Sequence, residues 1–189
     1  MYLFFDTETT GLPKNWKAPV TDLANWPRLV QLAYLLHDLD GKEISSGDFI
    51  IRPDGFTIPV ESSNIHGITT ERATREGAPL LSVLQQFEAL VGQATCLVAH
   101  NIAFDEKIVG AEFLRNKMPN SLPGKKKICT MERATNFCAI RGPYGYKWPK
   151  LSELYRALFQ CDFEEAHNAA ADIQATAKCF WELRRRGKL

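Results

Sequence analysis

Two acidic residues at the end of an apolar run, Asp6 and Glu8, are the first side chains in this sequence that could do chemistry. The run Tyr2-Leu3-Phe4-Phe5 before them is typical of a buried strand, and side chains alternate between the two faces of a strand. Asp6 and Glu8 would therefore share one face, where buried carboxylates repel each other unless a cation neutralises them. Mg²⁺ and Mn²⁺ prefer such oxygen ligands. Taken alone, the pair is explained more simply by a strand that ends in a polar turn.

Three further polar residues stand at the edges of apolar elements. Asp105 falls in the first turn of a predicted helix, where the helix dipole alone would favour an acid. His167 comes just before the last predicted helix and, taken alone, is a surface or packing histidine. Asp172 follows it by five residues, beside Ala169-Ala170-Ala171, whose small side chains would allow close approach.

Together, the four acids and the histidine fit a two-metal site that hydrolyses phosphodiesters. Two divalent cations about 3.5–4 Å apart would clamp a phosphate. Asp6 would bridge both ions, Glu8 and Asp172 would hold one of them, and Asp105 would support the other. His167, with an ordinary pKa near 6.5, would accept the proton of the attacking water.

The elements that must position these residues are strands and helices of one α/β domain spanning residues 1–189. We expect strands near residues 2–8, 30–36, 43–51, 96–99 and 128–130. We expect helices near residues 79–91, 100–116, 131–138, 151–158 and 168–186, with a further helix start at Thr69 or Thr70. Asp40-Gly41 indicates a hairpin, so the first three strands form an antiparallel meander. The later strand–helix–strand order indicates parallel strands, which gives a mixed five-stranded sheet with helices on both faces.

Composition sets limits on the function. Apolar residues make up 45% and charged residues 24% of the 189, as in ordinary globular domains. The net charge of +1 provides no general basic field, so nucleic acid would have to bind a local patch. The five cysteines lack Cys-x-x-Cys spacing and indicate free thiols in a reducing cytoplasm. We see no signal peptide and no apolar run long enough for a membrane span, and we expect a cytoplasmic protein.

Three segments resemble, in order, the motifs of the DEDDh 3′–5′ exonucleases. They are Asp6-Thr7-Glu8-Thr9-Thr10-Gly11, His100-Asn101-Ile102-Ala103-Phe104-Asp105 and His167-Asn168-Ala169-Ala170-Ala171-Asp172. The five-residue interval from His167 to Asp172 is that of the histidine branch of the family. The family includes the proofreading epsilon subunit of bacterial DNA polymerase III, whose relatives often carry a segment like Asn64-Ile65-His66-Gly67-Ile68-Thr69. The resemblance implies an RNase H-like fold and the metal and base roles given above.

The resemblance also implies a reaction, the removal of nucleoside monophosphates one at a time from a 3′ end with two Mg²⁺ or Mn²⁺ ions. Backbone amides near Glu8, with Thr7 or Thr10, would contact the terminal sugar and its 3′ hydroxyl. His66 would meet the terminal nucleotide, although a loop histidine satisfied by its own backbone explains this residue equally well.

Two segments could grip a single strand by phosphate contact and base stacking. They are the run Lys125-Lys126-Lys127 and a loop with Arg141, Tyr144, Tyr146, Lys147 and Trp148. A solvated lysine run and a loop pinned by its aromatic side chains explain them at least as well.

Other residues near the motifs have simpler explanations. We expect Trp16 and Trp26 to pack down the loop of residues 14–28, with base stacking as the alternative, and the loop itself has no functional assignment. His100 is expected to be structural and Phe104 to belong to the core.

Three functions follow, in order of preference. The first is an exodeoxyribonuclease acting on single-stranded or frayed 3′ ends in proofreading or repair. The second is an exoribonuclease of the same fold, and the third is a nucleic-acid-binding module without activity, against which the complete set of four acids and a histidine argues. The chain ends about 17 residues after Asp172, without the polymerase-binding tail of epsilon subunits. We therefore expect a free-standing exonuclease or an excised domain, with a DNA polymerase as the candidate protein partner and the oligomeric state undetermined.

Overall fold

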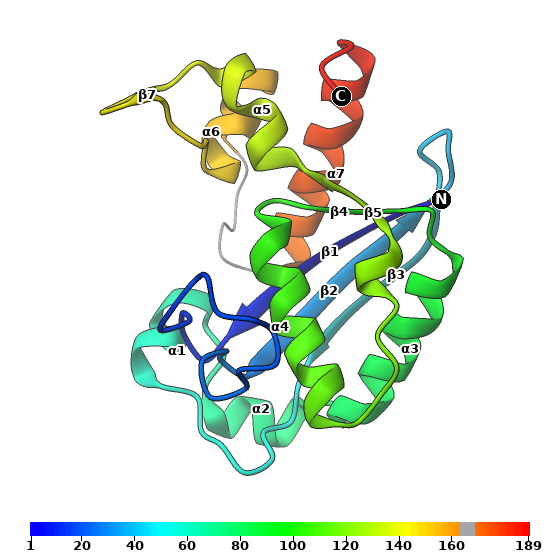
Figure 1. Cartoon of the computed structure of the whole chain (residues 1–189), viewed down its shortest axis with the longest axis vertical. Coiled ribbons are helices and arrows are strands. Elements are labelled where there is room, and N and C mark those ends of the chain that lie inside the picture. The colour runs from blue at the N-terminus through cyan, green and yellow to red at the C-terminus, as the bar shows by residue number, and fades with distance from the viewer. Residues whose placement is uncertain (163–168) are drawn as a thin grey trace.

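A central sheet of five strands organises the chain, whose computed structural model describes residues 1–162 and 169–189 (Figure 1). The strands are β1 (Tyr2–Thr9), β2 (Leu29–His37), β3 (Glu43–Ile50), β4 (Cys96–Ala99) and β5 (Lys126–Cys129). Their order across the sheet is β3-β2-β1-β4-β5. The first three strands pair antiparallel, and β4 and β5 run parallel to β1. The predicted mixed sheet with an antiparallel meander first is confirmed.

Helices cover both faces of this sheet. They are α1 (Val60–His66), α2 (Thr70–Glu76), α3 (Leu80–Gln93), α4 (Ile102–Arg115), α5 (Thr130–Cys138), α6 (Leu151–Phe159) and α7 (Ala169–Arg185). Helices α3 and α4 lie over one face and α7 lies over the other (Figure 1). Helices α5 and α6 pack beside α7, and a small hairpin, β6 (Arg141–Gly142) and β7 (Gly145–Tyr146), extends from them.

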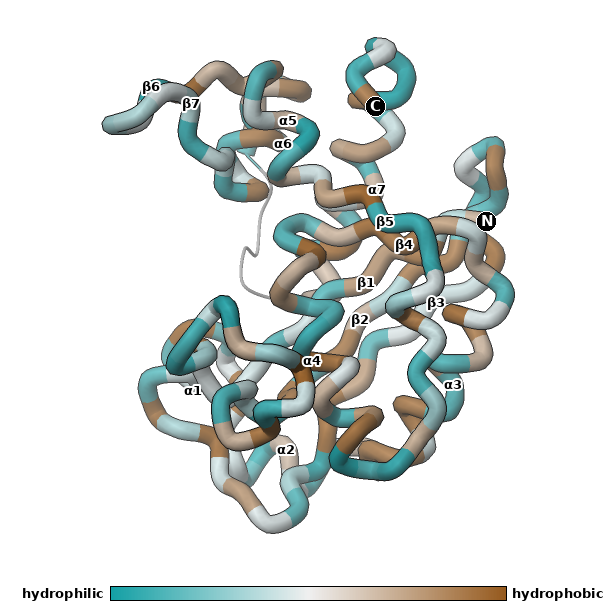
Figure 2. The backbone as a smooth tube through the Cα atoms, viewed as in Figure 1, coloured by the Kyte–Doolittle hydropathy of each residue, from teal (hydrophilic) through white to brown (hydrophobic). Residues whose placement is uncertain are grey.

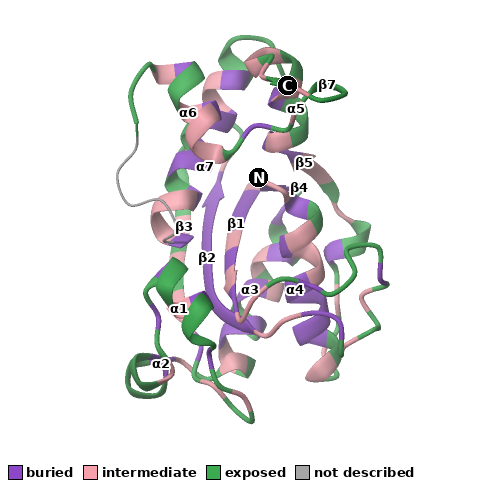
Figure 3. Cartoon of the chain, turned by 90° about the vertical axis from the view of Figure 1, so that its left-hand side faces the viewer, coloured by how far each residue is buried: buried purple, intermediate pink, exposed green. Residues whose placement is uncertain are grey.

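The alternating side chains of β1 divide the core into two clusters. Leu3 and Phe5 pack with α3 and α4, whereas Phe4 packs with Ile173 and Phe180 of α7. Hydrophobic segments accordingly recur along the central strands and the helices that face them (Figure 2). Strands β1 and β2 are largely buried, whereas α1 and α2 expose most of their residues (Figure 3). The next polar residues of β1 must follow the same alternation, which decides the faces of Asp6 and Glu8.

Most predicted elements are confirmed, with three differences. Helix α1 was not predicted, because its residues have no apolar stripe; it ends at Gly67, whose φ of 73° is the left-handed conformation that glycine allows at a helix end. Strand β5 begins two residues and ends one residue earlier than expected, and Thr130 begins α5 instead of ending the strand. The hairpin of β6 and β7 lies within a segment expected to be loop. Thr69 is confirmed as the cap of α2, since its side chain accepts a hydrogen bond from the Arg72 amide.

Within residues 1–162 and 169–189, none of the helices combines the length and apolar character that crossing a bilayer requires.

Candidate active site

Asp6 and Glu8 lie on the face of β1 that is turned toward α7. Phe4, two residues earlier on the same face, packs against α7, and both acids follow it in the alternation of the strand. Both side chains are half-buried. The two carboxylates therefore lie on one face of β1, as the sequence predicts, and it is the face on which Phe4 packs against α7.

The edge of β1 near these acids lacks a partner strand on one side. Strand β2 pairs with β1 from Tyr2 to Thr9, but β4 pairs with it only from Tyr2 to Phe4. The chain leaves β4 after Ala99 and enters α4 at Ile102. The first turn of α4 therefore lies beside the open half of β1, and it carries Asp105.

Asp105 is fixed in place by the strand. The backbone N–H of Thr7 donates to Oδ1 of Asp105 at 3.1 Å, and the Thr7 hydroxyl donates to the same oxygen at 2.7 Å. Asp105 is only 3% exposed. Both hydrogen bonds end on Oδ1, so they set the orientation of the carboxylate and do not involve Oδ2.

Helix α7 brings the third motif to the same place. Asp6, Glu8 and Asp172 each offer one carboxylate oxygen, and the three oxygens lie within 4.8 Å of one another. Asp105 is not in this tightest group, but its charge acts on both Asp6 and Glu8. The structure thus gathers the four predicted acids from β1, α4 and α7.

The protonation of this cluster reflects its burial and its crowding. Burial, with the charges of Asp105, Asp172 and Glu8, raises the pKa of Asp6 well above its ordinary value. Burial and the charges of Asp172 and Asp105 raise the pKa of Glu8 to about 8. Burial raises the pKa of Asp105 to about 7, although the bonds from Thr7 act in the opposite direction. Carboxylates crowded in this way favour a bound cation, and their hard oxygen donors fit a divalent ion such as Mg²⁺ or Mn²⁺.

The predicted base, His167, lies outside the described residues, so its role stays a prediction. Asp172, five residues later, is described and lies in the acid cluster.

A cavity of about 200 Å³ adjoins Glu8. It is lined by Thr7, Glu8, Thr9, Gly11, Leu12, Ser62, Ile65, His66 and Phe104. Three of the four residues predicted to contact substrate, Thr7, Glu8 and His66, are therefore together. The fourth, Thr10, does not line this cavity, and its hydroxyl accepts a hydrogen bond from the Arg28 amide at 3.0 Å.

His66 has one ring nitrogen engaged and one without a partner. Nδ1 accepts the Ile68 N–H at 3.2 Å, and Nε2 is buried and donates no hydrogen bond that meets normal geometry to a described residue. Burial lowers the pKa of His66, while the Thr9 backbone partly opposes this shift. A neutral ring whose Nδ1 accepts carries its proton on Nε2. The ring of His66 is therefore oriented by Ile68 at the wall of the cavity, with its Nε2–H near the Thr9 backbone.

Sequence reasoning missed part of this cavity. Ser62 and Ile65 belong to α1, which has no apolar periodicity, and Gly67 after it was the available signal of a helix end. Phe104, expected in the core, is half-buried: it packs against the core and also lines the cavity.

The two segments proposed for substrate grip are partly engaged within the protein. Lys125 donates to the carbonyls of Gly92 and Ala94 at the C-terminal end of α3, and Lys127 pairs with Glu106 at 2.8 Å. In the second segment Lys147 pairs with Glu153 at 2.6 Å. The aromatic side chains of that segment, Tyr144, Tyr146 and Trp148, are exposed.

His100 is structural, as expected. Its Nδ1 lies 2.9 Å from the Thr130 hydroxyl, and its Nε2 lies 3.0 Å from the Pro149 carbonyl. Burial lowers the pKa of His100 to about 4. The ring thus links the end of β4 to α5 and to the segment before α6.

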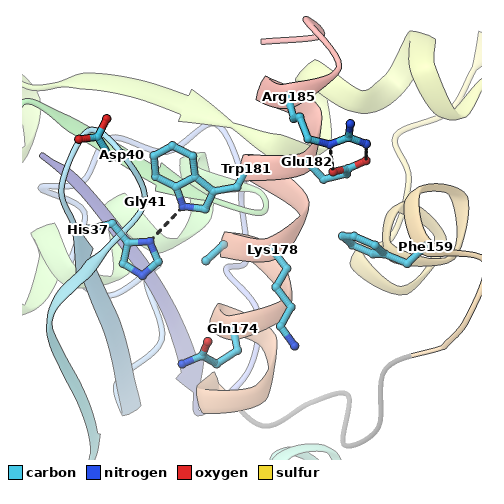
Figure 4. Close-up of a pocket in the computed structure, with 10 residues that line it drawn as sticks. His37, Asp40, Gly41, Phe159, Gln174, Lys178, Trp181, Glu182 and Arg185 are labelled. Carbon is cyan, nitrogen blue, oxygen red and sulfur yellow. Dashed lines mark hydrogen bonds and ion pairs between the residues drawn. The ribbon is translucent and has the colours of Figure 1, made fainter.

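A larger cavity, of about 460 Å³, lies between α7 and the turn after β2 (Figure 4). None of the four clustered acids lines it. Trp181 donates from Nε1 to Nδ1 of His37 at 3.0 Å, and Arg185 pairs with Glu182 at 2.7 Å. These four side chains are thus paired with one another in the cavity wall.

Comparisons with known proteins identify the family of the chain. A family model described as an exonuclease matches residues 3–180. The DNA polymerase III PolC-type of Streptococcus agalactiae (strain NEM316) is 33% identical over 177 residues, which are 94% of this chain and 11% of that protein. The PolC-type polymerase of Lactococcus lactis subsp. lactis (strain IL1403) is 30% identical over 190 residues, 98% of this chain and 10% of its own. The chain thus spans about a tenth of the length of these relatives.

Solved structures share the fold. E. coli exonuclease I in complex with a dA16 oligonucleotide superposes with a TM-score of 0.75 at 22% identity, covering 98% of this chain and 41% of that one. Exonuclease I from Methylocaldum szegediense superposes with a TM-score of 0.72 at 23% identity, covering 98% of this chain and 40% of that one. The RNase H-like fold is therefore confirmed. The family match, with the acids in their motifs, shows that the chain belongs to the exonuclease family, among the DEDD-type 3′–5′ exonucleases of the DNA polymerase III epsilon kind.

Proposed function

We propose that this chain is a metal-dependent 3′–5′ exonuclease that releases nucleoside 5′-monophosphates from single-stranded DNA ends. The observation that carries the proposal is the convergence of Asp6, Glu8 and Asp172 within 4.8 Å beside a cavity that Glu8 also lines. One side of Glu8 would face the metal ions, and the other would face the terminal nucleotide. This arrangement supports cleavage at the last phosphodiester and not within the strand.

Two Mg²⁺ or Mn²⁺ ions, when bound, supply positive charge at the phosphate and lower the pKa of a coordinated water. Asp6 would bridge the two ions, Glu8 and Asp172 would hold one, and Asp105 would support the other. The bonds from Thr7 keep Asp105 oriented for this role. A fixed orientation of the carboxylate favours catalysis, because a misplaced ligand stabilises the charge of the transition state less well.

The remaining steps fall to other residues of the chain. His167 would take the proton from the attacking water. His66, with its Nε2–H, and the backbone near Thr7 and Glu8 would hold the terminal nucleotide in the cavity. We propose that Thr10 acts indirectly, since its hydroxyl accepts from the Arg28 amide and so fixes the loop after β1.

The biological setting is proposed from the relatives. We propose that residues 1–189 form one exonuclease domain. The PolC-type names support proofreading beside a DNA polymerase, whereas the titles of the exonuclease I structures name DNA oligonucleotides and support a role on free single strands, as in repair.

The test is cleavage of two oligonucleotides of one sequence, DNA and RNA, each labelled at the 5′ end. Each is incubated with Mg²⁺, with Mn²⁺ and with EDTA. A metal-dependent ladder that shortens from the 3′ end, faster on DNA, is expected. A faster ladder on RNA would make the chain an exoribonuclease, and labelled internal fragments in place of the ladder would contradict exonucleolytic cleavage.

The acid cluster is tested by Asp6→Asn, with Asp54→Asn as the matched control. Asp54 is an exposed acid that lies outside both the cluster and the cavity. Asp6→Asn should abolish the ladder and retain oligonucleotide binding, whereas Asp54→Asn should cleave like the wild type. Unchanged cleavage by Asp6→Asn would contradict the two-metal assignment, and binding without cleavage by the wild type would indicate a module without activity.

A further inference from the structure

The loop between β1 and β2 is held against α4 along much of its length. Lys107 donates from Nζ to the carbonyls of Trp16 and Ala18 at 3.2 and 3.1 Å. Arg115 donates to the carbonyls of Leu23 and Trp26, each at 2.7 Å. The loop therefore has a defined backbone position, set by polar contacts from one helix.

The end of the loop is fixed to the same helix. Glu112, fully buried, accepts hydrogen bonds from Arg28 and from the Leu29 amide at 2.9 and 3.1 Å. Gly110 lets the loop approach α4 closely, since a Cβ there would lie 3.2 Å from Val20. A loop anchored in this way can present a side chain at little cost in conformational entropy.

The two tryptophans of the loop have different environments. Trp26 is 3% exposed, and its indole Nε1 donates to the Pro19 carbonyl at 2.9 Å. Trp16 is 52% exposed, although its backbone carbonyl is held by Lys107. Trp26 packs the loop, as expected from the sequence, whereas the exposed indole of Trp16 is not required for that packing.

Trp16 lies beside the cavity of the candidate active site. The centroid of its ring is 5.6 Å from that of Phe104, and Phe104 lines the cavity together with Glu8 and His66. Two more exposed apolar side chains, Leu12 (72% exposed) and Ile65 (61% exposed), line the same cavity. Large exposed apolar groups gathered at one site indicate a binding surface.

The charges around Trp16 favour a nucleic acid strand over an apolar protein surface. Lys14 and Lys17 are exposed on either side of it and form no salt bridge within the described part of the chain. An exposed aromatic ring between two free cations suits a base and its flanking phosphates.

We propose that Trp16, with Phe104 behind it, forms a stacking subsite for a base within the last two nucleotides of the strand. Lys14 and Lys17 contact the neighbouring phosphates. This subsite rests on the proposed function, because it places the 3′ end in the cavity next to Glu8. It assigns the loop of residues 14–28 a role in substrate binding.

The test is a double-mutant cycle that combines substitutions in the protein with abasic substitutions in the oligonucleotide. Binding is measured by fluorescence anisotropy with Mg²⁺, and every protein variant also carries Asp6→Asn. The protein variants are Trp16→Ala and Trp16→Phe. The oligonucleotides are a 5′-labelled oligothymidylate and versions with one abasic residue at the terminal, the penultimate or the tenth position from the 3′ end. Leu39→Ala is the control variant, because Leu39 is a similarly exposed apolar side chain (59% exposed) on the turn after β2, outside the cavity and both candidate grip segments.

Stacking predicts that Trp16→Ala weakens binding of the intact strand roughly 5- to 150-fold, the range for one base on an aromatic ring. Trp16→Phe should retain most of the affinity. An abasic residue at one of the last two positions should weaken binding to the parent protein by a similar factor, and should have no further effect on Trp16→Ala. The tenth-position substitution should have no effect on either protein.

The subsite is overturned if Trp16→Ala binds like the parent, or if the abasic and Trp16→Ala effects multiply. It is also overturned if Leu39→Ala removes the abasic effect, since the loss would then reflect general weakening. Cleavage by the wild-type protein is followed in parallel. Coupling without cleavage would retain the subsite and contradict the proposed function, whereas cleavage without coupling would contradict the subsite alone.

Discussion

Thr7 donates two hydrogen bonds, from its backbone N–H and its hydroxyl, to the same oxygen of Asp105. Residue 7 of the strand thereby orients an acid 98 positions away, at the edge where β4 has already left β1. The hydroxyl bond also favours the ionised form of Asp105, against the effect of burial.

We therefore predict that Thr7→Val lowers kcat/KM about 10- to 100-fold, the cost of one hydrogen bond to a charged group. Valine has the shape of threonine without its hydroxyl, so the pKa of Asp105 should rise and the alkaline shift should be visible in the pH profile of activity. Thr7→Ser, which retains the hydroxyl, is the control and should keep the wild-type profile. An equal loss in both variants would show that the methyl group, and not the hydrogen bond, matters.

The acid cluster should make the metal-free protein less stable at high pH. Acids whose pKa is raised in the folded state contribute most below their unfolded values, and this contribution is lost as pH rises through the folded pKa. Glu8 titrates near 8 and Asp105 near 7. In EDTA, the free energy of unfolding should therefore fall between about pH 4 and pH 8 and level off above pH 8.

Removal of one charge should reverse this loss. In EDTA, the free energy of unfolding of Asp6→Asn should exceed that of the wild type by about 1–3 kcal/mol at pH 8.5, and the difference should be smaller at pH 5.5. Mg²⁺ should raise the melting temperature of the wild type more at pH 8.5 than at pH 5.5, because binding must displace fewer protons there. Urea titrations at both pH values, with Asp54→Asn as control, measure the effect; a stability gain that is independent of pH would argue against electrostatic repulsion.

Glu112 should be a stability determinant of the loop. Its Oε1 accepts from Arg28, from the Leu29 amide and from Arg115, and the side chain is fully buried. Glu112→Ala leaves two arginines without their partner, so we expect a loss of about 3–5 kcal/mol in the free energy of unfolding. Glu132→Ala, at an exposed helical position, should change it by less than about 0.5 kcal/mol. Denaturant unfolding compares the two, and similar small losses would mean that the loop is held mainly by other contacts.

Some features of the candidate site could be predicted from the sequence, and others could not. Asp6 and Glu8 were predictable because their shared face follows from the two-residue period of a strand. The contact between Thr7 and Asp105 was not, because it depends on β4 pairing with β1 only as far as Phe4. A local pattern does not contain that register.

The same limit explains the lysine run. Its composition is that of a phosphate-binding patch, yet Lys125 donates to carbonyls that end α3, and Lys127 pairs with Glu106. These partners lie about 20 to 30 positions away, and only the packing of β5 beside α3 and α4 brings them close. Helix α1 escaped prediction for a different reason, since its exposed residues have no periodic apolar face.

His66 provides the sharpest test of the cavity, because its two ring nitrogens have separate tasks. Nδ1 accepts the Ile68 N–H, and Nε2 is buried without a partner among the described residues. Asparagine places an oxygen near the position of Nδ1 and lacks the outer donor, whereas glutamine places an amide N–H near the position of Nε2. We predict that His66→Asn retains stability but raises KM about 2- to 10-fold, the range for one neutral hydrogen bond. His66→Gln should show the reverse, a near-normal KM with lower stability. Steady-state kinetics on a DNA oligonucleotide and thermal unfolding give both quantities, and a normal KM for His66→Asn would mean that Nε2 does not contact substrate.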